Sequence, residues 1–273
     1  MAKLEIGVLV HLAAAPRETF RKVAELGLRS CQLCSWDPQL WTSLVRDRVL
    51  AASEEFGVSI STFWAGYPGP KAWNFVEGPL TIGLVPRQYR CERAAVLKKA
   101  SDFAKSLHLP SITTHAGFIP ENPNNPDFTG TVKALRGIAA RCLKNGMELW
   151  FESGQETPVT LLRTMECIGA DNLGINLDPA NLVMYGKANP VDALEVFGKF
   201  VRGVHAKDGL YPTDGTNIGI ELPLGEGKVD FPTLIRRLKK LGYAGPLTIE
   251  REIGGAKQIR DIRKAIRLLK RLC

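Results

Sequence analysis

The sequence predicts an α/β fold, a single (β/α)8 TIM barrel that spans residues 1–273. Short apolar runs alternate with longer helical patterns along the chain, which is typical of βαβ units and a parallel sheet. The length of 273 residues is close to the roughly 250 residues that one such barrel needs. No linker or low-complexity tract divides the chain, and no GxGxxG follows the first strand. We therefore expect one domain and no dinucleotide-binding fold.

Eight short apolar runs are predicted to form the barrel strands, at 4–10, 29–35, 59–65, 111–116, 147–153, 173–178, 201–206 and 246–251. The patterns between them predict helices at 16–26, 42–56, 86–107, 131–145, 158–168, 190–199, 230–241 and 256–272. Pro86, Pro158 and Pro190 suit first helical turns, and glycines such as Gly57 suit the helix ends.

Three strand-to-helix loops are long, at 66–85, 117–130 and 209–229. In a barrel these loops lie at the carboxyl ends of the strands, where such folds bind their substrates. This end is therefore the predicted working face.

Composition excludes several classes of partner. The formal net charge is +8, but much of the excess lies on the polar face of the amphipathic C-terminal helix, so no nucleic acid is expected. No apolar stretch reaches the roughly 20 residues that span a bilayer. Lys3 before GVLVHLAAAP imitates a signal peptide, but Glu5 lies where that signal needs positive charge. We expect a cytoplasmic enzyme, without a membrane partner.

The six cysteines do not form a metal-binding pattern. Cys31 and Cys34 make a CxxC, yet it lies inside a predicted apolar strand and has no second CxxC. Residues three apart on a strand point to opposite faces. Both are expected to be buried thiols.

Four predicted strands end on side chains that can bind a metal: Glu152, Asp178, His205 and Glu250. The first three are 26 and 27 residues apart, about one βα unit each, and a long loop extends the last interval to 45. Barrel closure should bring the four together, and converging carboxylates repel one another unless a cation neutralises them. We expect one divalent metal ion. Three oxygen ligands and one imidazole favour Mn²⁺, with Mg²⁺, Co²⁺ or Zn²⁺ as alternatives.

These four residues, together with HAKD (205–208) and LGEGKVDF (224–231), resemble the sugar phosphate isomerase/epimerase family, the xylose isomerase-like TIM barrels. The resemblance covers essentially the whole chain. It implies a small-molecule carbohydrate substrate, a ketose or related keto-sugar, that reacts through a metal-bound enediolate. It also implies that Glu152 and Glu250 act as an acid/base pair on the two faces of one carbon. Family analogy further allows a homo-oligomer.

Other functions remain open at this stage. The same enediolate could expel a leaving group, which would make the protein a metal-dependent lyase or dehydratase acting on a keto-sugar, an inosose or a 3-keto-glycoside. An endonuclease IV-like nuclease is less favoured, because its three zinc ions need more histidines than the four in this chain. A non-catalytic sugar-binding barrel is a further alternative, but sugar binding alone does not require three carboxylates around one metal ion.

Further residues are predicted around the centre. His115 ends the fourth strand and is a candidate catalytic base. The predicted substrate contacts are Lys207, Asp208, Gln155, Glu156, Asn181, Trp64 and His11. Asn181 takes the place at which the epimerases carry a histidine after the aspartate ligand. Tyr67 and Trp73 are alternatives to Trp64 for stacking on a sugar ring.

Overall fold

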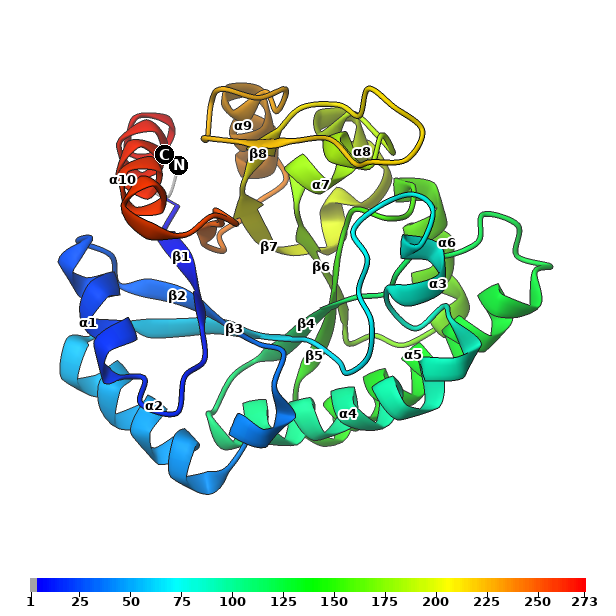
Figure 1. The fold of residues 1–273 in the computed structure, drawn as a ribbon, viewed down its shortest axis with the longest axis horizontal. Coiled ribbons are helices and arrows are strands. Elements are labelled where there is room, and N and C mark those ends of the chain that lie inside the picture. Colours follow the sequence, from blue (N-terminus) through cyan, green and yellow to red (C-terminus); the bar gives the residue numbers. More distant parts are fainter. Residues whose placement is uncertain (1–3) are drawn as a thin grey trace.

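The computed structural model describes residues 4–273, so Lys3 lies outside the described residues. Eight parallel strands close into a barrel in the order β1-β10-β7-β6-β5-β4-β3-β2. Their bounds are Ile6–His11 (β1), Ser30–Ser35 (β2), Ser59–Ala65 (β3), Ser111–His115 (β4), Glu148–Glu152 (β5), Leu173–Leu177 (β6), Val201–Ala206 (β7) and Leu247–Ile249 (β10). The predicted (β/α)8 barrel is confirmed (Figure 1).

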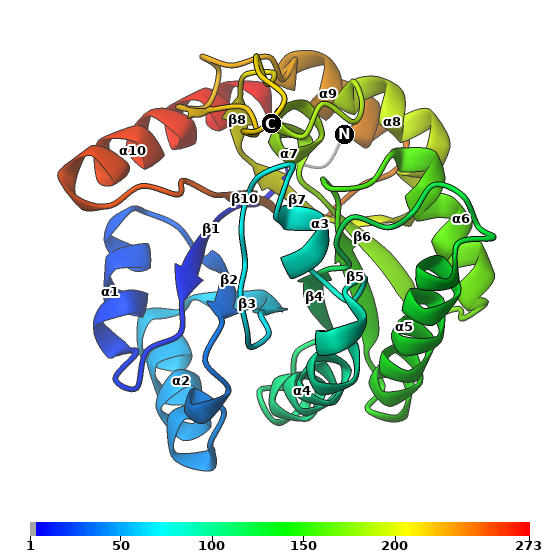
Figure 2. The same cartoon turned by 45° about the vertical axis from the view of Figure 1, so that its right-hand side comes forward.

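A ring of longer helices surrounds the strands (Figure 2). They are Arg17–Glu25 (α1), Ser43–Phe56 (α2), Arg87–Ser106 (α4), Pro126–Lys144 (α5), Pro158–Ile168 (α6), Pro190–Phe197 (α8), Phe231–Lys240 (α9) and Gly255–Leu272 (α10). Their apolar faces pack against the outer side of the barrel in one hydrophobic core. Two short 3-10 turns lie at Pro38–Leu40 and Gly198–Phe200.

Helix α5 begins earlier than predicted. It starts at Pro126 instead of residue 131, because the Asn125 side chain accepts the backbone N–H of Asp127 and caps the helix. The loop after β4 is correspondingly shorter than 117–130.

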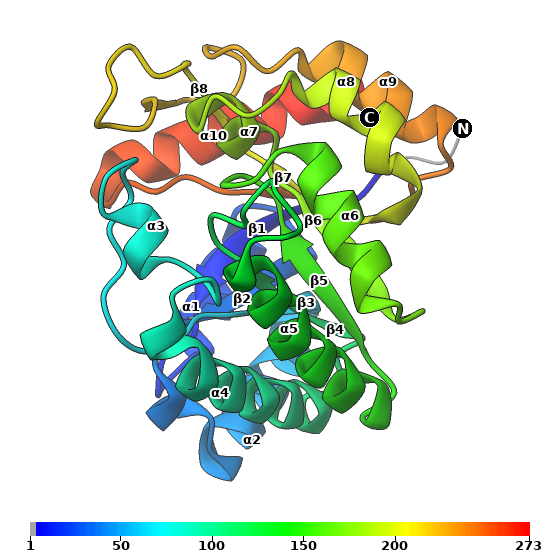
Figure 3. The ribbon, with the colours of Figure 1, turned by 90° about the vertical axis from the view of Figure 1, so that its right-hand side faces the viewer.

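The loops at the carboxyl ends of the strands contain structure that the sequence patterns did not indicate. Helix α3 (Gly78–Thr81) lies in the loop after β3, and helix α7 (Pro179–Met184) begins directly after Asp178. Two-residue strands β8 (Asp208–Gly209) and β9 (Glu221–Leu222) pair antiparallel in the loop after β7. In Figure 3 these additions gather on the side toward which the arrow of β5 points. They cover the working face.

Strand register decides which side chains meet inside the barrel. His115 pairs with Glu152 across β4 and β5, and His205 pairs with Thr248 across β7 and β10. Residues aligned in this way point to the same side of the sheet. The barrel interior near its carboxyl end is therefore polar, while the alternate residues face the helices.

Two further expectations can be compared with the structure. Cys31 and Cys34 are both buried and free of disulfide bonds, as predicted. Within residues 4–273, no helix has the length and apolar character needed to cross a membrane.

Candidate metal centre

The four predicted ligands converge at the carboxyl ends of their strands. Glu152 ends β5, His205 lies in β7, and Asp178 and Glu250 directly follow β6 and β10. One ligand atom from each lies within 4.8 Å of all the others. Glu152, Asp178 and His205 are buried, and 11% of the Glu250 side chain is exposed. The barrel thus brings together residues that are almost 100 positions apart in the chain.

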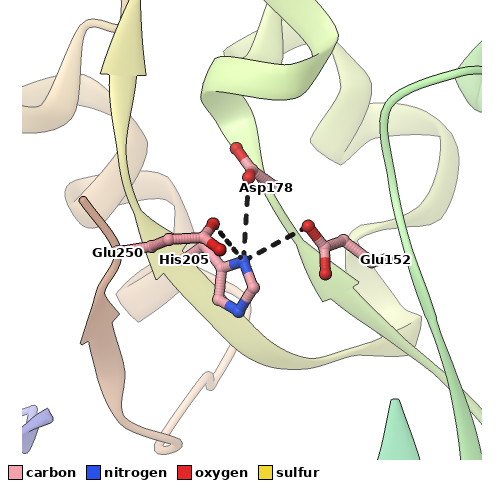
Figure 4. Close-up of side chains that lie close together, drawn as sticks. All are labelled: Glu152, Asp178, His205 and Glu250. Atoms are coloured by element: carbon pink, nitrogen blue, oxygen red, sulfur yellow. Dashed lines mark ion pairs between the residues drawn. The ribbon is translucent and has the colours of Figure 1, made fainter. Parts of the chain in front are cut away.

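The imidazole of His205 lies between the three carboxylates (Figure 4). Its Nδ1 is 3.0 Å from Glu250 Oε2, 3.4 Å from Glu152 Oε1 and 3.6 Å from Asp178 Oδ2. All four side chains point toward one spot. Such a group of three oxygens and one nitrogen suits a divalent cation.

The ligand atoms show that a cation fits. His205 Nδ1, Asp178 Oδ2 and Glu250 Oε2 are buried and have no hydrogen-bond partner among residues 4–273. Buried polar atoms without partners are rare in folded proteins, because each loses its hydration without compensation. A bound metal ion would satisfy all three together.

A buried chain of amides holds His205 from behind. Its Nε2 lies 2.5 Å from Gln32 Oε1, and Gln32 Nε2 donates to Asn176 Oδ1 at 3.2 Å. Because an amide oxygen only accepts, Nε2 must carry the proton of this bond. In the neutral ring the lone pair is then on Nδ1, which faces the carboxylates. Gln32 was missed from the sequence, since it lies inside an otherwise apolar strand.

Asp178 is fixed by the helix that follows it. Its Oδ1 accepts the backbone N–H of Asn181 at 2.9 Å and so caps α7. Its own backbone N–H donates to Ser153 Oγ at 3.0 Å. These bonds leave Oδ2 directed at the centre. Ser153 also ties the ends of β5 and β6 together.

Neutral donors hold the carboxylate of Glu152. The indole N–H of Trp64 donates to Oε2, and Asn181 Nδ2 donates to Oε1 at 3.1 Å. His115 Nε2 lies 3.7 Å from the same Oε1. Trp64 therefore orients a ligand, in addition to lining the cavity where it was predicted to meet substrate.

A buried ammonium group faces Glu250. Lys207 Nζ lies 3.3 Å from Glu250 Oε2, 3.5 Å from Asp178 Oδ2 and 3.2 Å from Glu252 Oε1. It also donates to Asn181 Oδ1 at 3.4 Å. Lys207 thus supplies positive charge to the centre on one side.

These contacts change the proton affinities of the centre. Burial alone would raise the pKa of Glu152 and Glu250, but nearby cations outweigh it and hold both pKa values below their ordinary range. Burial would lower the pKa of His205, yet Glu250 and Glu152 raise it well above its usual value. The pKa of Asp178 is raised, chiefly by burial. Without a metal, the protein compensates its carboxylates with protonated His205 and Lys207.

Asp208, which was predicted to contact substrate, has its carboxylate hydrogen-bonded within the protein. Its two carboxylate oxygens accept four backbone N–H groups at 2.9–3.0 Å, from Gly209, Gly225, Gly227 and Val229. A carboxylate has about four acceptor positions, so none is left for a ligand. Asp208 instead fixes the conformation of the loop after β7.

Gln155 and Glu156 do not line the cavity either. Both are buried beside it, and burial raises the pKa of Glu156 to about 8. The prediction of direct substrate contact therefore has no support for these two residues. Tyr67 is buried as well: its hydroxyl accepts the backbone N–H of Gly83, and the Arg93 guanidinium lies 4.5 Å from its ring centre.

A cavity of about 580 Å³ opens above the ligands. The predicted residues His11, Trp64, His115, Asn181 and Lys207 all line it, together with Trp73. The His115 ring contacts the rings of Trp64 and Trp73, at centroid distances of 5.3 and 5.4 Å. Its Nδ1 has no hydrogen-bond partner among the described residues. Tyr185 and Glu252 also line the cavity or its rim, and the sequence had not marked them.

Comparison with known proteins agrees with this architecture. Residues 20–272 match the family model of the xylose isomerase-like TIM barrel. The crystal structure of a xylose isomerase domain protein from Planctomyces limnophilus is 32% identical, with a TM-score of 0.93, and the match covers 99% of this chain and 98% of that one.

Two more distant similarities were found. An uncharacterized protein of Methanocaldococcus jannaschii is 28% identical over 185 residues, which are 64% of this chain; the match spans only 60% of that protein's length. The crystal structure of a D-tagatose 3-epimerase-like protein is 21% identical, with a TM-score of 0.74, covering 98% of this chain and 97% of that one. At this identity the likeness is one of fold.

Proposed function

The chain belongs to the family of xylose isomerase-like TIM barrels, and we propose that it is a divalent-metal-dependent isomerase or epimerase of a ketose or related keto-sugar. The observation that carries this proposal is the buried group of Glu152, Asp178, His205 and Glu250, whose ligand atoms lie within 4.8 Å of one another. Three of these atoms have no hydrogen-bond partner among residues 4–273. Membership of this family supports a small-molecule carbohydrate as the substrate.

The four residues would hold the ion, with Mn²⁺ as our first choice. When bound, the ion would polarise a carbonyl oxygen and its neighbouring hydroxyl and so acidify the C–H bond between them.

Glu152 and Glu250 have the chemistry for the proton transfers. They approach the centre from different strands, β5 and β10, on either side of His205 (Figure 4). We assign one carboxylate to remove the proton from the substrate carbon and the other to return a proton to the opposite face, which inverts that carbon. Their positions are fixed by Trp64, Asn181 and Lys207.

Other cavity residues would bind the substrate oxygens. His115 presents a buried Nδ1 without a protein partner among the described residues, beside Glu152. We assign it to a substrate hydroxyl on that side, or to proton transfer there. Lys207 would donate to an oxygen beside Glu250.

Deuterium exchange tests this function. Protein loaded with Mn²⁺ is incubated in deuterated water with D-tagatose, D-fructose and D-psicose, and the sugars are followed by NMR and mass spectrometry. We expect one carbon-bound deuterium and a stereoisomeric product from at least one sugar. Protein stripped of metal by a chelator is the control and should give neither.

Two results would contradict the proposal. Release of water or of an aglycone, with an unsaturated product, would assign the protein to the lyases or dehydratases. If the metal-loaded protein gave no exchange with a wider panel of keto-sugars and keto-glycosides, the result would favour a non-catalytic sugar-binding barrel.

A further inference from the structure

The loop after β3 (residues 66–85) supplies part of the cavity wall through an aromatic side chain. Trp73 lines the cavity, and its ring centre lies 5.4 Å from that of His115 and 6.2 Å from that of Trp36. In Figure 2 this loop, which carries α3, passes in front of the barrel strands. The position of Trp73 therefore depends on the path of a loop and not on a strand of the barrel.

One buried guanidinium group gathers the two ends of this loop. Arg93, on α4, donates from Nε to the backbone carbonyl of Pro68 and from Nη2 to that of Pro70, both at 3.0 Å. Its Nη1 donates to the carbonyls of Thr81 and Gly83, both at 2.7 Å. The first two carbonyls and the last two lie at opposite ends of the loop. Arg93 thus closes the loop at these four residues, which we call its neck.

The loop provides most of the compensation for burying the charge of Arg93. This residue is fully buried. Within residues 4–273, its hydrogen bonds all go to backbone carbonyls and none goes to a carboxylate. The rings of Tyr67 and Tyr89 each lie 4.5 Å from its central carbon. A buried cation loses its hydration, and here carbonyl dipoles and aromatic faces replace it.

The tip of the loop is held separately from its neck. At the neck, the Tyr67 hydroxyl also accepts the backbone N–H of Gly83 at 2.8 Å. At the tip, the backbone N–H of Phe75 donates to the carbonyl of Thr216 at 2.8 Å, in the loop after β7. Because the tip has its own anchor, loss of Arg93 should loosen the loop without detaching it from the cavity.

We propose that Arg93 is a positioning residue, which fixes the neck of the loop after β3 and so holds Trp73 in place against the sugar. This inference rests on the proposed function, since it concerns how the same cavity binds its substrate. Arg93 does not line the cavity itself. It therefore acts through Trp73, beside His115.

The kinetics of deuterium exchange test this role. They are measured on the Mn²⁺-loaded protein with whichever of D-tagatose, D-fructose and D-psicose exchanges fastest. Arg93→Met should raise KM about tenfold and keep kcat within about threefold, because roughly one aromatic contact with the bound sugar is lost. Arg141→Met is the matched control, since the Arg141 guanidinium pairs with Asp102 between α5 and α4, away from the loop. It should change neither constant.

A double-mutant cycle separates positioning from a purely structural role. Trp73→Ala should raise KM by a similar factor, and adding Arg93→Met should raise it no further, because the residue through which Arg93 acts is then absent. A substitution that only destabilised the fold would lower activity equally in both backgrounds. Tyr67→Phe removes another bond of the neck and is a milder change, which replaces Arg93→Met in the cycle if that variant does not fold.

The placement of Trp73 can also be followed without a substrate. The chain has five tryptophans, so labelling with 5-fluorotryptophan gives one fluorine NMR signal for each, and Trp73→Ala identifies the signal of Trp73. In Arg93→Met this signal should move toward its position in the unfolded protein. In Arg141→Met it should stay where it is in the wild type.

The outcomes separate the two claims. An unchanged KM in both Arg93→Met and Tyr67→Phe, or an equal rise in KM with and without Trp73, would overturn the inference and leave the proposed function standing. An unmoved fluorine signal of Trp73 in Arg93→Met would overturn it as well. Absence of exchange by the wild-type protein with every sugar would reject the proposed function, and the positioning role with it.

Discussion

The two glutamates of the metal centre have the same side chain but opposite kinds of support. Glu152 is held by neutral donors, the Trp64 indole and the Asn181 amide. Glu250 faces the Lys207 ammonium group at 3.3 Å. Figure 4 shows the two carboxylates on either side of His205.

This difference has a physical consequence. The negative charge at Glu250 faces the Lys207 ammonium group as well as His205, even without a metal. The negative charge at Glu152 is held by neutral donors and by the imidazoles of His205 and His115. Asn181 connects the sides, because its amide donates to Glu152 and accepts from Lys207. A centre built in this way should respond unequally when either side is changed.

The largest effect is expected from replacing each glutamate in turn. Glu152→Gln and Glu250→Gln keep an oxygen near the centre but remove a proton acceptor, so each should lower kcat by about 10²–10⁴-fold. If each glutamate serves one face, each variant should still exchange the proton of one epimer and not of the other. Deuterium exchange started from each epimer measures this. Wild-type rates in both variants would show that the acid and base lie elsewhere.

The next effect concerns stability without metal. Lys207→Met leaves Glu250 and Asp178 with less compensation and should destabilise the metal-free protein by about 3 kcal/mol, or roughly 6–12 °C in Tm. Asn181→Ala removes hydrogen bonds to the Glu152 carboxylate and the Lys207 ammonium group but leaves both charges in place, and should cost about 2 kcal/mol. Thermal unfolding with and without Mn²⁺ measures both, and the ion should restore more stability in Lys207→Met. Equal losses of stability in the two variants would show that the two glutamates do not differ in how their charge is compensated.

Support from behind the centre should have a smaller effect. Gln32→Leu removes the acceptor that fixes the proton on Nε2 of His205, so metal affinity should fall about 10–100-fold. Nitrogen-15 NMR of the metal-free protein at high pH should show the neutral ring losing its single tautomer. Gln39→Leu, at an exposed position, is the control. An unchanged affinity and tautomer would show that Gln32 only fills space.

The smallest effect is a dependence of metal binding on pH. Burial opposes the charge of His205, but Glu250 and Glu152 raise its pKa well above the ordinary value, so the metal-free ring is protonated at neutral pH. A metal needs the Nδ1 lone pair, so binding must release that proton. Affinity should rise about tenfold per pH unit below the raised pKa. Calorimetry at pH 7 in buffers of different ionisation enthalpy measures the proton release, and its absence would contradict this assignment.

The sequence predicted the scaffold and the ligand-bearing strand ends for one reason. In a closed parallel barrel, the period of one βα unit brings every strand end to the same mouth, so spacing alone places Glu152, Asp178 and His205 side by side. The predicted start of helix α5 was wrong because the cap formed by Asn125 was not recognised in the sequence.

Residues that act through specific contacts could not be found in the same way. Gln32 resembles any polar residue within a strand until the register brings it against His205. Asp208 follows a ligand and looked like a substrate contact, but its four acceptor positions are filled by a loop whose path no spacing rule describes. The candidate metal ligands can be predicted from the residues at the strand ends. The residues that hold those ligands in place depend on tertiary packing and cannot be predicted in this way.

Metal content tests the central claim most directly. Protein soaked in Mn²⁺ and desalted is analysed for metal, alongside Asp178→Ala and the control Asp171→Ala, whose residue is exposed near the start of β6. We predict about one ion per chain in the wild type and in Asp171→Ala, and none in Asp178→Ala. A wild-type protein that retains no ion, or an Asp178→Ala protein that keeps its ion in full, would contradict the assignment of this centre.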